Sequence, residues 1–169
     1  MITTTAERII ANLQGADGRP FTIFVDRLLR AYGYVLGVAD AEIVTTVRTN
    51  VPDGGVGTEI RVPFPGDKTG LLGTRSVWQY KATAFARIQR STLLDGTYVK
   101  QRVAAGDAFR LCLADGMPAD KIEEWESDLW LEAKQLNPNA PRMGEKLSLI
   151  YEGVMPRLHS ALESSAVDA

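Results

Sequence analysis

The hydrophobic positions of the chain change spacing along its length, and this change predicts helices packed around one sheet. From Pro20 to Gly33 the apolar residues recur every three or four positions, as on the buried face of a helix. The same spacing predicts a helix over Asp120–Leu136, where acidic residues occupy the other positions. Weaker helical patterns cover four further segments: 4–13, which begins with a capping-box sequence, 84–90, 98–105 and 144–164.

Three short runs rich in β-branched and aromatic residues and one apolar run predict four strands between these helices. They are Ile43–Arg48, Val56–Phe64, Ser76–Thr83 and Phe109–Ala114. A turn at 52–55 and a loop at 66–70 separate the first three strands, which we expect to form a meander. The element order predicts an α/β fold, with a mixed sheet flanked by helices.

Length and composition are those of a soluble globular protein. The 169 residues are expected to form a single domain, 45% of them hydrophobic and 24% charged, with 164–169 as a tail or linker. There is no apolar run of the roughly 20 residues that span a membrane and no secretory signal pattern, so a cytoplasmic protein is expected. The single cysteine, Cys112, fits a reducing compartment and lies in an apolar strand, which predicts a core position.

The net charge of −2 conceals two segments of opposite sign. Residues 61–102 contain eight basic and two acidic residues, whereas residues 103–132 contain two basic and eight acidic residues. A basic face of this kind attracts a polyanion such as double-stranded DNA, although ordinary solvated surface is the alternative interpretation. The candidate phosphate contacts are Lys68, Arg75, Arg87, Arg90, Lys100 and Arg102.

The polar residues of the second and third strands suggest metal-assisted chemistry. Because side chains alternate between faces, Glu59 is expected on one face with Gln79 and Lys81, and Gly57 shares the parity of Glu59. Asp53 lies on the preceding turn. Mg²⁺ or Mn²⁺ prefers oxygen ligands, and the candidates are Asp53, Glu59, Gln79 and the backbone carbonyl of Tyr80. The catalytic candidates are Asp53, Glu59, Gln79 and Lys81, with Lys81 orienting a water or offsetting phosphate charge. Ordinary strand surface is the alternative.

The segments 53–56 (Asp-Gly-Gly-Val) and 77–81 (Val-Trp-Gln-Tyr-Lys) together resemble the core motif of PD-(D/E)xK nucleases in its Gln-x-Lys form. Within that superfamily the chain is similar to Mrr-like restriction endonuclease domains, found at the N-termini of bacterial anti-phage defence proteins. Residues 21–34 also resemble the first core helix of the family, and 110–115 with 121–126 resemble a later strand and helix, so the likeness covers about residues 20–140. It implies a restriction-endonuclease-like core, Mg²⁺-dependent DNA cleavage, and an NTPase or sensor module after this domain.

The chain departs from the family pattern at two positions. Gly57 stands where the family has its principal metal-binding Asp, and Thr22 stands where it often has Glu. Glu59 or Asp53 could replace the missing carboxylate, or the site could be degenerate and bind DNA without cutting it. A protein-interaction module that uses the acidic helix 120–136 is a further alternative, and self-association into a homo-oligomer stays open.

Overall fold

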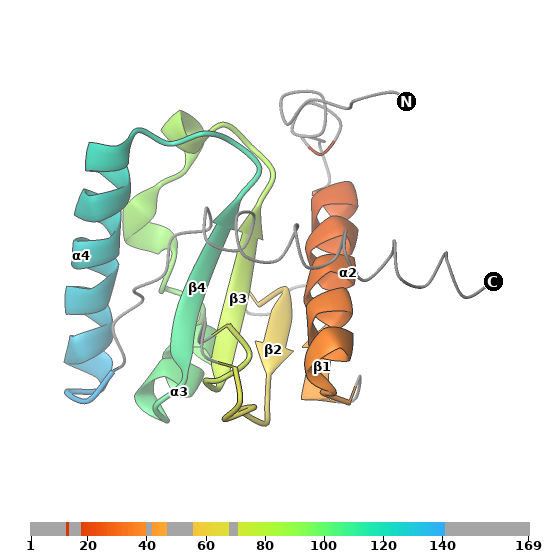
Figure 1. The fold of residues 1–169 in the computed structure, drawn as a ribbon. Helices are drawn as coiled ribbons and strands as arrows, with labels where there is room; N and C mark the ends of the chain where they lie inside the picture. Colours follow the sequence, from red (N-terminus) through yellow and green to blue (C-terminus); the bar gives the residue numbers. More distant parts are fainter. Residues whose placement is uncertain (1–12, 14–17, 40–41, 47–55, 68–70, 141–169) are drawn as a thin grey trace.

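A four-stranded mixed sheet lies between helices in the computed structural model, which describes residues 13, 18–39, 42–46, 56–67 and 71–140 (Figure 1). Its strands are β1 (Ile43–Thr45), β2 (Thr58–Ile60), β3 (Ser76–Lys81) and β4 (Ala108–Leu113). They lie side by side in the order β1-β2-β3-β4, with an antiparallel β1-β2-β3 meander and β4 parallel to β3. The predicted α/β class, a meander plus a later strand flanked by helices, is confirmed.

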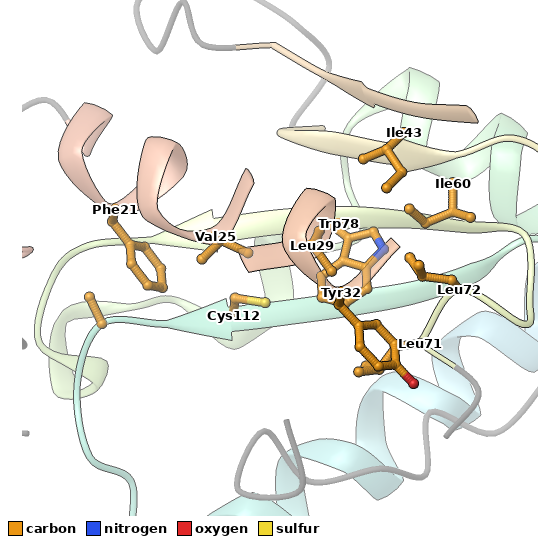
Figure 2. Close-up of a cluster of buried hydrophobic side chains, with 11 residues drawn as sticks. Phe21, Val25, Leu29, Tyr32, Ile43, Ile60, Leu71, Leu72, Trp78 and Cys112 are labelled. Atoms are coloured by element: carbon orange, nitrogen blue, oxygen red, sulfur yellow. The ribbon is translucent and has the colours of Figure 1, made fainter. Parts of the chain in front are cut away.

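One face of the sheet is covered by α2 (Arg19–Leu36), as Figure 2 shows. Phe21, Val25 and Leu29 of α2 pack toward Trp78 of β3 and Cys112 of β4, and all five side chains are buried. We call this the α2 face. Cys112 is therefore a core residue, as its apolar strand predicts.

The opposite face is covered by α3 (Thr97–Ala104) and α4 (Ala119–Leu136), and we call it the α3/α4 face. Its apolar cluster contains residues of β3, β4, α3 and α4 and of the segments that connect or flank the elements: Val56, Val77, Leu93, Leu94, Val99, Val103, Phe109, Leu129, Ala133 and Ala140. Figure 1 shows α2 and α4 on opposite sides of the sheet.

Several predicted boundaries are wrong. Helix α2 continues past Gly33 and ends at Leu36, and the next residue, Gly37, has the left-handed φ of 74° that favours glycine. The predicted helix at 84–90 is replaced by two 3₁₀ turns, Phe85–Arg87 and Arg90–Thr92. So short a segment forms a helix only weakly, and the intervening Ile88 is extended.

The predicted helices at 4–13 (apart from Leu13) and 144–164, the turn at 52–55 and the tail at 164–169 lie outside the described residues. β1 and β2 are each shorter than predicted, with three residues. Among the described residues, no helix combines the length and apolarity that a membrane crossing requires.

Candidate functional site

Glu59, Gln79 and Lys81 occupy one face of the sheet, as predicted. Glu59 of β2 is paired with Val77 of β3, and Gln79 and Lys81 follow Val77 at two-residue intervals. Because alternate residues of a strand point to the same side, all three polar residues share the α3/α4 face with Val77. Lys81 lies four residues beyond Val77 on β3, which is roughly 13 Å along the strand. Because Glu59 is opposite Val77, Gln79 lies between Glu59 and Lys81 on this face.

Gln79 is a buried amide with an unsatisfied acceptor. Its side chain belongs to a residue only 8% exposed, and its Oε1 atom has no hydrogen-bond donor among the described residues. Most buried polar atoms have a partner, and an exception requires an explanation such as a bound ion or water. Lys81 is partly exposed, and within the described part of the chain its ammonium group forms no ion pair.

Glu59 is equally buried at 8% exposure, but both of its carboxylate oxygens accept hydrogen bonds. The Tyr98 hydroxyl of α3 donates to Oε1 at 2.9 Å, and Arg61 Nε donates to Oε2 at 3.1 Å. Partial burial, followed by the bond to Glu59, raises the pKa of Tyr98, so its hydroxyl keeps the proton it donates.

These two partners of Glu59 were not among the predicted site residues. Arg61 has the strand parity of Glu59, which is a signal that the sequence carries. Tyr98 comes from a helix distant in sequence, and only tertiary packing brings it to β2.

Gly57 does not share the face of Glu59, so that prediction is wrong. The Gly57 N–H donates to the Trp78 carbonyl at 2.7 Å, although Trp78 is already paired with Thr58. Two residues of one strand therefore lie opposite one residue of the next, which is a β-bulge and breaks the alternation of side chains. A Cβ atom on Gly57 would lie 2.5 Å from the Tyr80 ring. The preceding residue, Val56, packs in the cluster on the α3/α4 face. An Asp at position 57 would consequently point into Tyr80.

The Tyr80 side chain belongs to the α2 face, so only its backbone carbonyl remains a candidate metal ligand. Its hydroxyl donates to Thr58 Oγ1 at 2.7 Å, and its ring packs edge-on against Phe21. Burial raises the pKa of Tyr80 well above its ordinary value, and the hydroxyl stays neutral. The Tyr80 ring thereby restricts position 57 to glycine.

Asp53 and Lys68 lie outside the described residues, so the structure does not test their predicted roles. Val56 is the first described residue after the segment that carries Asp53, and the register of β2 runs from Thr58, opposite Trp78, away from Gln79. The chain thus enters β2 at the Gln79 end of the site.

Most of the predicted DNA contacts are engaged in ion pairs with acidic residues. Arg75 Nε lies 3.1 Å from Oδ1 of the buried Asp107, and Arg102 pairs with the other oxygen of the same carboxylate. Lys100 pairs with Asp95 at 3.1 Å.

Arg90 pairs with two acids of α4, Asp128 at 3.3 Å and Glu132 at 2.6 Å. Part of the basic segment is therefore neutralised by the acidic segment that follows it in sequence. Arg87 is exposed and has no ion-pair partner within the described ranges.

The described donors suit a magnesium-type ion but do not form a complete ligand set. No group of three or more His, Cys, Asp or Glu side chains that could hold a metal occurs among the described residues. Glu59 and Gln79 supply one carboxylate and one amide oxygen, and Mg²⁺ commonly uses one or two carboxylates and keeps several waters. The orphan Gln79 oxygen is the observation that fits such an ion.

Comparison with protein-family models, with curated proteins and with solved structures gives no match to this chain. The resemblance to PD-(D/E)xK nucleases thus stays a prediction from the motif.

Proposed function

We propose that this chain is a metal-dependent DNA endonuclease domain that hydrolyses phosphodiester bonds, as an effector in bacterial defence. One observation carries the proposal: the buried Gln79 oxygen without a donor lies on the same sheet face as Glu59 and Lys81. A buried acceptor without a partner is unfavourable for folding, and a ligand that supplies positive charge would offset that cost.

Each residue has a role that its chemistry supports. Glu59 and Gln79 would hold Mg²⁺ or Mn²⁺ through oxygen atoms, with waters, the Tyr80 carbonyl or Asp53 completing the set. The ion would polarise the scissile phosphate and lower the pKa of a bound water. Lys81 would offset the charge that develops on the phosphate oxygens or orient the attacking water.

Plasmid cleavage with Mg²⁺ or Mn²⁺ tests the proposal directly. We expect nicking or linearisation by the unmodified chain and a loss of at least about 100-fold in Lys81→Ala, as for other charge-stabilising groups. Lys121→Ala is the matched control, because Lys121 is a lysine on α4 that pairs only with Glu124 among the described residues. Cleavage that is equal in all three chains, or that persists with EDTA, would contradict the assignment.

A second candidate function is DNA binding without cleavage. The specific observation in its favour is the bulge at Gly57, which turns that position toward Tyr80. Among the described residues of β2, Glu59 is then the one carboxylate on the α3/α4 face. A gel-shift experiment at low and moderate salt separates the two: binding that weakens with salt in a chain that never cleaves would support this alternative. In that assay, Arg87→Ala is expected to weaken binding more than Arg90→Ala, because Arg90 is already neutralised by α4.

A further inference from the structure

The Glu59 carboxylate has two donors of very different character. Tyr98 is neutral and belongs to α3, which is anchored by the fully buried Val99 and Val103. Arg61 is cationic, its side chain is 54% exposed, and it contacts Glu59 through one nitrogen at 3.1 Å. The Tyr98 contact is therefore held by packing, whereas Arg61 is joined to Glu59 by one ion pair from a side chain that is mostly in solvent.

The position of Arg61 along β2 determines how it would affect a metal ion bound at Glu59. Arg61 follows Glu59 on the side away from Gln79, because the register of β2 against β3 runs from Ile60 opposite Ser76 toward Thr58 opposite Trp78. A divalent ion shared by Glu59 and Gln79 would lie on the opposite side of the carboxylate. Because Tyr98 holds Oε1, the ion would compete with the guanidinium for Oε2, and the like charges of the two cations would repel each other.

We propose that Arg61 is a built-in cationic competitor of the metal: it neutralises Glu59 in the metal-free chain, and a divalent ion displaces it. This inference rests on the proposed function, and it assigns to Arg61 the tuning of metal affinity. Tyr98 keeps its bond to Oε1 and orients the carboxylate in both states.

Mn²⁺ titration followed by electron paramagnetic resonance tests the proposal without any need for cleavage activity. Arg61→Gln is expected to bind Mn²⁺ about three- to tenfold more tightly, since a partly exposed ion pair and its repulsion of the ion are both removed. Lys121→Gln removes one positive charge from α4 and an ion pair with Glu124, and it should leave the affinity unchanged.

Glu59→Gln and Gln79→Leu separate failure of this inference from failure of the proposed function. If Glu59→Gln abolishes binding but Arg61→Gln has the affinity of the unmodified chain, or a lower one, Arg61 is no competitor and only this inference is overturned. If no chain binds Mn²⁺, or if binding is indifferent to Glu59 and Gln79, both proposals are overturned.

Discussion

The hydroxyl groups on the α2 face of the sheet contrast with one amide oxygen on the α3/α4 face. On the α2 face the described hydroxyls are paired: Thr58 contacts Thr45 at 2.7 Å and accepts a hydrogen bond from Tyr80 at 2.7 Å, and Trp78 Nε1 donates to Ser76 at 2.9 Å. On the α3/α4 face Gln79 is also buried, yet its side-chain carbonyl oxygen has no described donor.

This difference separates a face that stabilises the fold from a face that carries the candidate chemistry. Paired hydroxyls within an apolar cluster cost little and specify the packing, whereas an orphan acceptor lowers stability unless a ligand completes it. Proteins commonly accept such local losses where function requires them.

The largest effect is expected at Cys112, which tests how dry the α2 face is. Burial raises the pKa of the Cys112 thiol to about 12, compared with an ordinary 9.0. The native thiol should therefore react with a disulfide reagent at pH 8 about 1,000-fold more slowly than the unfolded chain, because only the thiolate attacks. Rapid reaction in the native state would show that water reaches this face.

The raised pKa of Cys112 also predicts how the free energy of unfolding changes at alkaline pH. The raised pKa gives Cys112 a stabilising contribution that is complete below pH 9 and is lost as the pH rises toward 12, because the unfolded chain releases the proton first. The free energy of unfolding should fall about 1.4 kcal/mol per pH unit more steeply than in Cys112→Ala. Parallel curves for the two chains would contradict this.

Gly57→Ala is the next largest change, and it tests the bulge at the boundary between the two faces. The added methyl group would lie 2.5 Å from the Tyr80 ring, which Thr58 and Phe21 hold in place. We expect a loss of about 1–3 kcal/mol in the free energy of unfolding, measured by urea denaturation. Gly116→Ala is the control, since nothing lies within 4 Å of its added atom. Equal stability of both variants would exclude the close approach of Tyr80.

Thr58→Val and Gln79→Leu give the smallest effects and compare the faces most sharply. Thr58→Val removes two satisfied hydrogen bonds on the α2 face and should destabilise the chain by about 1–2 kcal/mol. Gln79→Leu removes an unsatisfied acceptor and should be neutral or stabilising by up to about 1 kcal/mol in metal-free buffer. The reverse order in chemical denaturation would mean that Gln79 has a partner of its own.

Local rules in the sequence predict much of this arrangement. Alternation along β3 correctly assigns Gln79 and Lys81 to one face, and the apolar stripe of the helix ending at Leu136 is long enough to define it. The bulge at Gly57 could not be predicted, because it depends on how the Gly57 N–H pairs with the Trp78 carbonyl of the neighbouring strand. Charge sums over segments likewise do not show that Arg90 pairs with Glu132, since ion pairing is decided by tertiary contacts.

Whether the Gln79 oxygen binds a metal ion is tested by the unfolding of the original chain and of Gln79→Leu, each with Mn²⁺ and with EDTA. We expect Gln79→Leu to be at least as stable as the original chain in EDTA, and only the original chain to gain stability with Mn²⁺, by about 1.4 kcal/mol at ten times the dissociation constant. A Gln79→Leu chain that is less stable in EDTA and gains equally from Mn²⁺ would contradict this expectation.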